Sequence, residues 1–131
     1  MKRSKLKKVS KQPISKLQRE LWQQCRRVAG IFYKKDCYTC PQKALQGANC
    51  HLGHVPWPKS TLGAFLKYDM RVLRFQCYSC NVHKGGMGAE AYKRMLREEG
   101  KPYMNLLEKD RQKTVKAYDF YVELLEYYKS L

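Results

Sequence analysis

Two short stretches, Cys37-Tyr-Thr-Cys40 and Cys77-Tyr-Ser-Cys80, decide how this chain is expected to fold. Each is a Cys-x-x-Cys pair, and residues 41–76 lie between them. One such pair can bind one side of a metal ion, and four thiolates at about 2.3 Å complete a closed tetrahedral zinc shell. The four cysteines therefore predict a structural zinc site. Two disulfides or free thiols are the alternatives.

The rest of the composition favours metal over disulfides. The chain has 131 residues and no apolar run as long as a signal-peptide core or a membrane span. We therefore expect a cytoplasmic protein without a membrane partner, and in that compartment thiols stay reduced and paired cysteines more often hold metal. The length fits one domain with an appendage.

The charge points to a polyanionic partner. The chain has 27 Lys and Arg against 11 Asp and Glu, a formal net charge of +16. Residues 1–35 hold twelve of these bases and only one acid, Glu20. A local excess of this size predicts nucleic acid as the partner, whereas a solubilising tail is the plain alternative and an anionic membrane surface fits less well. The residues predicted to bind nucleic acid are Lys2, Arg3, Lys5, Lys7, Lys8, Lys11, Lys16, Arg19, Arg26, Arg27 and Lys84.

The N-terminal part divides in two. Residues 1–12 hold too few large apolar side chains to bury, so we expect a basic flexible arm. Within residues 13–35, apolar side chains recur at helical spacing and predict a basic amphipathic helix from Ser15, its N-cap, to Ala29. Gly30 is expected to end this helix. Its apolar face includes Cys25, which we assign to the core and not to the metal site.

Residues 36–99 are expected to form a zinc-bound ββα-metal module. Strands are predicted at Cys50–Val55 and Val72–Phe75, with a partly ordered loop at Ser60–Asp69 between them. The first Cys pair is placed on a tight turn between two short strands, and a helix is expected at Ala89–Glu99. Helices therefore flank a small zinc-stabilised hairpin, which makes the fold class α+β.

Residues 100–131 are predicted to carry one C-terminal, aromatic-rich helix, with apolar residues at spacings of three and four from Val115 to Leu125. A helix this aromatic needs a surface to pack against. The surface can belong to the same chain or to a second copy, in which case this helix forms a homodimer. The sequence leaves both alternatives open.

One histidine and one asparagine suggest a catalytic site. Asn81 follows the fourth cysteine at the start of a predicted helix, and His54 ends a predicted strand, so in a zinc-clasped hairpin we expect the two to converge on one divalent cation and one water. Phosphodiester hydrolysis needs such parts, because a neutral imidazole can deprotonate water and a hard cation stabilises the charge that develops on the phosphate. A structural or zinc-binding role for His54 is the alternative.

The pattern Cys-x-x-Cys, then His51-x-x-His54, then Gln76-Cys-x-x-Cys-Asn81, followed by Gly-Gly at 85–86 and a helix that carries a tyrosine, resembles the NinG (Rap) recombination endonucleases of lambdoid phages. Through them it is similar to the His-Me finger (HNH, endonuclease VII-like) superfamily on a treble-clef zinc scaffold.

The resemblance covers roughly Leu17 to Leu107. It implies a metal-dependent endonuclease that cuts branched DNA such as Holliday junctions during phage recombination in a bacterial host, with structural Zn²⁺ and catalytic Mg²⁺ or Mn²⁺.

The resemblance also implies roles for single residues. His54 matches the general base of the family, and Asn81 matches its helix-start metal ligand. The acid or histidine that often precedes the base as a second ligand is Gly53 here, and His51 is the nearest substitute, although it should point to the other side of the strand. The asparagine that orients the base falls near Val72, so another residue or a backbone carbonyl must hold His54. His83 is expected to contact a phosphate or to lie at the surface, and not to bind the metal.

Two functions fit these residues. The first is the nuclease on branched DNA, which the residues His54 and Asn81 favour. The second is a zinc-stabilised module that binds DNA or RNA without catalysis, which the absence of an acid at Gly53 favours.

Overall fold

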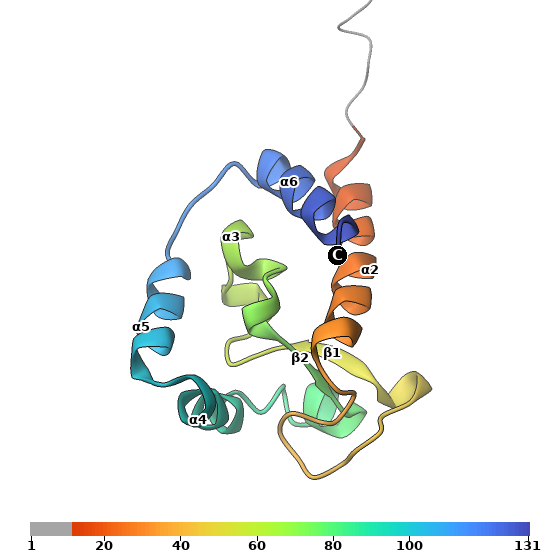
Figure 1. Cartoon of the computed structure of the whole chain (residues 1–131), viewed down its shortest axis with the longest axis vertical. Coiled ribbons are helices and arrows are strands. Elements are labelled where there is room, and N and C mark those ends of the chain that lie inside the picture. The colour runs from red at the N-terminus through yellow and green to blue at the C-terminus, as the bar shows by residue number, and fades with distance from the viewer. Residues whose placement is uncertain (1–11) are drawn as a thin grey trace, which may run out of the picture.

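The structure is a computed structural model that describes residues 12–131. Six of the predicted nucleic-acid-binding residues lie outside this range, namely Lys2, Arg3, Lys5, Lys7, Lys8 and Lys11. The helices and strands are α2 (Ile14–Phe32), β1 (His51–His54), α3 (Ala64–Lys67), β2 (Leu73–Gln76), α4 (Gly88–Glu99), α5 (Lys101–Asp110) and α6 (Ala117–Lys129) (Figure 1). Helices combined with one small sheet confirm the α+β class.

Helix α2 is longer than predicted at both ends. Pro13, and not Ser15, occupies the N-cap position, because the amides of Lys16 and Leu17 both donate to the Pro13 carbonyl at 3.1 Å. The prediction that Gly30 ends the helix was wrong as well. Gly30 stays helical, and the helix closes only where the Tyr33 amide donates to Ala29 O at 2.8 Å.

The described residues form one sheet, in which β1 and β2 pair antiparallel. His51 lies opposite Gln76, and His54 lies opposite Leu73. This confirms the hairpin that the hydrophobic pattern predicted, with each strand shorter or shifted by about one residue. The further strands expected around the first Cys pair are absent from residues 12–131. A single backbone–backbone hydrogen bond, from the Tyr38 amide to Phe75 O, joins that segment to β2.

The segment between the two strands, residues 55–72, includes the predicted loop Ser60–Asp69 and is ordered by a charged cluster. It contains α3 and two 3₁₀ turns, Lys59–Thr61 and Met70–Val72. Arg71 donates to Asp69 at 2.9 Å and to Asp110 at 2.9 Å, so it ties the second turn to the end of α5. The loop therefore has a fixed position beside the sheet.

Two hydrophobic cores lie on either side of the hairpin. The first is formed by the inner faces of α2 and α6 with the cysteine-rich segments, and it includes Cys25, which is fully buried as predicted. The second is formed by α4, α5 and α3 and includes Met95 and Leu107. Figure 1 shows α2 beside α6 at one end and α4 beside α5 at the other, with β1 and β2 between them.

The single C-terminal helix predicted for residues 100–131 is two helices. Gly100 adopts a left-handed φ of 88° that ends α4, and Pro102 in the first turn of α5 starts a new helix. Helix α6 then buries Tyr121, Leu125 and Tyr128 against α2 of the same chain. Its main apolar face is therefore covered within the chain.

Candidate active site

The four predicted metal ligands lie together. The sulfur atoms of Cys37, Cys40, Cys77 and Cys80 are all within 4.8 Å of one another. Cys40 Sγ and Cys77 Sγ are 3.7 Å apart, close to the roughly 3.8 Å that separates two sulfurs of a tetrahedral site with Zn–S bonds of about 2.3 Å. Cys25 and Cys50 are not part of the cluster. The four cysteines can therefore hold a structural metal such as zinc.

Without a cation, the pKa values of the clustered thiols shift in opposite directions. Burial would raise the pKa of Cys37, but hydrogen bonds from the Cys77 amide, at 3.3 Å, and from Thr39 lower it to about 6. Burial and the neighbouring sulfurs raise the pKa of Cys80 to about 12. Four sulfurs this close cannot all be thiolates without a cation, and a bound Zn²⁺ removes the conflict.

The cysteine cluster fixes the elements that carry the polar residues. It joins the segment after α2 to a π-helical turn, Ser79–His83, which is separated from the end of β2 by two residues. Asn81 lies in this turn, and the Tyr78 amide donates to Asn49 Oδ1 at 2.9 Å. The turn is thereby held against β1, which carries both predicted histidines.

His54 is held in one orientation on the side of β1 that faces α2. Its ring stacks on Trp22, and its Nε2 lies 2.8 Å from the carbonyl oxygen of Lys67. Because a carbonyl only accepts, Nε2 carries the proton of the neutral ring and Nδ1 keeps its lone pair. Nδ1 has no protein partner and is not among the buried unpaired atoms of the described residues, so it is open to solvent. A backbone carbonyl thus orients His54, while Val72 is a core residue.

The surroundings keep His54 neutral. Burial lowers the pKa of His54 below its ordinary value of 6.5, and the positive charges of Lys59 and Lys67 lower it further, against the opposing effect of the Lys67 carbonyl. A neutral imidazole with a free lone pair can accept a proton from water.

Asn81 contacts His51, and no hydrogen bond joins Asn81 to His54 within the described part of the chain. Asn81 Nδ2 lies 3.0 Å from His51 Nδ1, and His51 Nε2 lies 2.9 Å from Ala48 O. Both ring nitrogens of His51 are therefore occupied. Because successive residues of a strand point to opposite faces, β1 directs the His51 and His54 rings to different sides.

Gln76 is a polar residue of this site that sequence reasoning did not assign. It is fully buried, and its Oε1 is the only buried side-chain N or O atom without a partner in the described residues. A Cβ built on Gly53 would overlap with this Oε1 and would lie 2.8 Å from Asn81 Oδ1. The cross-strand pairing of residues 51 and 76 is the signal that could have found it.

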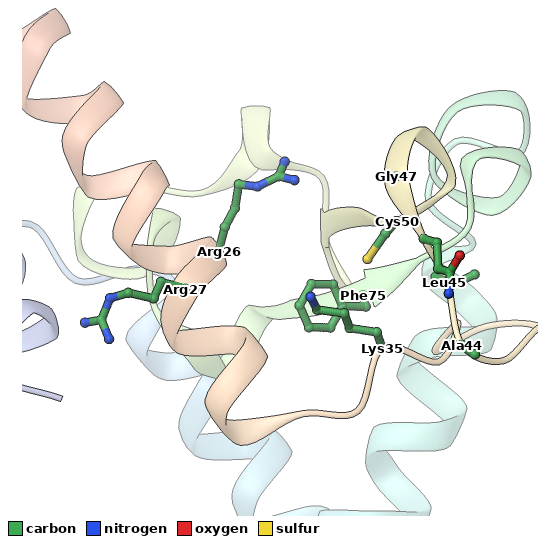
Figure 2. Close-up of a pocket in the computed structure, with 9 residues that line it drawn as sticks. Arg26, Arg27, Lys35, Ala44, Leu45, Gly47, Cys50 and Phe75 are labelled. Carbon is green, nitrogen blue, oxygen red and sulfur yellow. The ribbon is translucent and has the colours of Figure 1, made fainter.

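The predicted basic residues differ in their environments. Lys16, Arg19, Arg26 and Lys84 are exposed, as is His83. Arg27 is exposed too, but it caps α6, because it donates to Tyr128 O at 2.7 Å and to Leu131 O at 3.1 Å. Figure 2 shows Arg26 and Arg27 pointing in different directions from α2. Both line a cavity of about 690 Å³ together with Lys35 and Phe75.

Two further bases stand near His54 and were not predicted. Lys59 and Lys67 line a cavity of about 590 Å³ together with Arg19 and Trp22. Lys67 lies in the segment Ser60–Asp69 that was expected to be a partly ordered loop, and Lys59 directly precedes this segment, so only the folded chain brings both lysines to α2. This side of the molecule offers positive charge next to the His54 imidazole.

Comparisons of the chain with protein-family models, with curated proteins and with solved structures found no significant match. In residues 12–131, none of the helices combines the length and the apolar character that crossing a bilayer requires.

Proposed function

We propose that this protein is a metal-dependent endonuclease that hydrolyses phosphodiesters in branched DNA of the Holliday-junction type, with His54 as the general base. The orientation of His54 carries the proposal. Its Nε2 is anchored on Lys67 O, its Nδ1 is open, and burial lowers its pKa. These are the properties that a base near neutral pH needs.

The chemistry uses few groups of the chain. Nδ1 of His54 takes a proton from water as the water oxygen forms a bond to phosphorus, and the bond from phosphorus to the leaving oxygen breaks. The leaving oxygen is protonated by solvent. A bound Mg²⁺ or Mn²⁺ would supply stabilisation of the charge on the phosphate, and Asn81 is the residue proposed to bind it. Lys59, Lys67 and Arg19 attract the DNA backbone.

The remaining parts of the proposal concern scaffold and assembly. Zn²⁺ bound by the four cysteines is structural, and the Cys pairs, the hairpin and the following helix are proposed to be a treble clef. The protein acts in the cytoplasm of a bacterial host during phage recombination. A homodimer would use the exposed remainder of α6, where Tyr127 is 58% accessible, and would match the two-fold symmetry of a junction.

The second candidate is a zinc-stabilised module that binds DNA or RNA without cutting it. The hydrogen bonds of His51 favour this candidate. Asn81 and Ala48 O are the partners of its two ring nitrogens, so neither nitrogen is left to bind a catalytic metal. The stacking of His54 on Trp22, which a purely structural histidine would also show, favours it as well.

Cleavage of a labelled four-way junction and of the matching linear duplex distinguishes the two candidates. The zinc-loaded protein is tested without added metal, with Mg²⁺ and with Mn²⁺, as wild type, as His54→Ala and as the surface control His83→Ala. We expect metal-dependent cutting of the junction, about 10²- to 10⁴-fold slower in His54→Ala and unchanged in His83→Ala. Tight junction binding without cutting in any metal would establish the binding module instead.

A further inference from the structure

The side-chain amide of Gln76 has a defined orientation. Its Nε2 donates to Thr39 Oγ1 at 3.0 Å and to the carbonyl oxygen of Gly86 at 2.7 Å. The carbonyl of Gly86 cannot donate, so a flipped amide would set two acceptors against each other. The nitrogen must therefore face Gly86. The Gln76 Oε1 atom is consequently aimed at Gly53, where it has no partner and no exposure.

The amide of Asn81 is oriented by a similar chain of donors and acceptors. Ala48 O can only accept, so Nε2 of the neutral His51 ring is the donor and Nδ1 is the acceptor. Nδ1 then accepts from Asn81 Nδ2 at 3.0 Å. The Asn81 Oδ1 atom is left facing Gly53, and it has no partner among the described side chains. His51 thus acts as a positioning residue for Asn81.

Two carbonyl-type oxygens therefore converge over one glycine with no donor between them. Like partial charges repel each other, and a buried carbonyl oxygen without a donor is destabilising. Only a residue without a Cβ fits below them, because any side chain at Gly53 would collide with Gln76 Oε1. A cation or a water donor above Gly53 would remove the repulsion.

We propose that Gln76 Oε1 and Asn81 Oδ1 together ligate the divalent cation, so that Gln76 supplies the oxygen that a side chain at position 53 cannot. Amide oxygens are hard ligands suited to Mg²⁺ and Mn²⁺. Two neutral oxygens give a weak site by themselves, and water and a substrate phosphate complete the shell. This inference depends on the proposed function for the identity of the cation.

Binding of Mn²⁺ can be followed without any cleavage assay. In ¹⁵N-labelled, zinc-loaded protein, paramagnetic broadening reports which amides lie near the ion even when affinity is low. We expect the amide signals of Gly53 and Asn81 to broaden first. In Gln76→Ala the same broadening should need about tenfold more Mn²⁺, since even outer-shell changes cost that much. The exposed glutamine on α2 gives the matched control, Gln23→Ala, which should behave as wild type.

A ligand exchange tests the same idea if Gln76→Ala perturbs the fold. Gly53→Asp alone should destabilise the protein, because the new Cβ meets the Gln76 amide. Combined with Gln76→Ala, which vacates that space, Gly53→Asp should place a carboxylate beside Asn81 and bind Mn²⁺ more tightly than Gln76→Ala does. Failure of the double variant to regain affinity would count against ligation at this point.

The outcomes separate this inference from the nuclease proposal. Broadening that depends on Gln76 in a protein that cuts no DNA would retain the cation site and remove the proposed activity. Metal-dependent cutting with Mn²⁺ binding unchanged in Gln76→Ala would retain the nuclease and remove Gln76 as a ligand. If Mn²⁺ broadens no signal near Gly53, the unpaired oxygen holds water and the inference is overturned.

Discussion

The indole of Trp22 stacks on the imidazole of His54, with ring centroids 5.5 Å apart and ring planes 9° apart. The contact joins α2 to the end of β1. Together with the bond from His54 Nε2 to Lys67 O, it fixes both the plane and the rotation of the imidazole. One residue of the N-terminal helix thereby controls the group that we propose as the base.

Replacing Trp22 should therefore change the titration of His54. In Trp22→Ala the ring becomes more exposed, and because burial is the largest cause of its lowered pKa, the pKa should rise towards 6.5. NMR titration of the His54 ring protons measures it directly. Trp22→Phe keeps an aromatic surface and should keep most of the shift. Equal pKa values in wild type and Trp22→Ala would show that the stack does not desolvate His54.

The pH dependence of cleavage should follow the same group. The neutral form of His54 is the base, so activity should fall as the pH drops below about 6.5 and through the lowered pKa. The free energy of unfolding should also decrease as the pH falls, because the unfolded chain binds the proton more readily than the folded protein does. The contribution of His54 to stability is complete above 6.5 and is lost as the pH falls through its folded pKa. Rate profiles and denaturant melts between pH 5 and 8 check both.

Lys59, one of the two lysines near His54, allows a test of how positive charge affects the pKa of His54. Removing the positive charge in Lys59→Gln should raise the pKa of His54, so the acidic limb of the rate profile should move to higher pH. Lys93, which is exposed on α4, provides the control Lys93→Gln. A uniform loss of rate without movement of the limb would mean that Lys59 acts only through DNA binding.

The zinc prediction concerns stability. Structural Zn²⁺ contributes about 10–16 kcal/mol in small finger peptides, and here it joins two segments that no long strand connects. Cys80→Ser should lose the metal and the cooperative unfolding transition. Cys50→Ser, which lies outside the cluster, should keep one zinc per chain. Metal content and thermal melts compare the two variants, and a metal-free wild type with an unchanged melt would exclude a structural role.

The sequence predicted what local spacing determines. The two Cys-x-x-Cys pairs, the hairpin and α4 follow from ligand spacing, alternation and a terminal glycine, and the structure confirms the Cys cluster and these elements. The site depends on strand register. Pairing of His51 with Gln76 places an unassigned glutamine in the site, and alternation along β1 separates His54 from the His51–Asn81 contact. Neither result is visible in residue types alone.

The helix ends show a second limit. Gly30 carried the expected stop signal, but tertiary packing of α2 on α6 outweighed a glycine cost of about 1 kcal/mol, so the helix continued. Gly100 carried the same signal and did end α4, because its φ of 88° is one that other residues rarely adopt. Composition does not distinguish the two glycines.

Arg26 and Arg27 should separate DNA binding from stability. Arg27 donates to two carbonyls at the C-terminal end of α6, so Arg27→Gln should lower the free energy of unfolding by about 1 kcal/mol. Arg26 has no such bond, although like Arg27 it lines the cavity of about 690 Å³, so Arg26→Gln should leave stability unchanged and weaken junction binding. If Arg26 contacts a phosphate, the slope of log affinity against log salt should fall by about 1. Denaturant melts and binding at several salt concentrations measure the two effects, and identical behaviour of both variants would contradict the assignment.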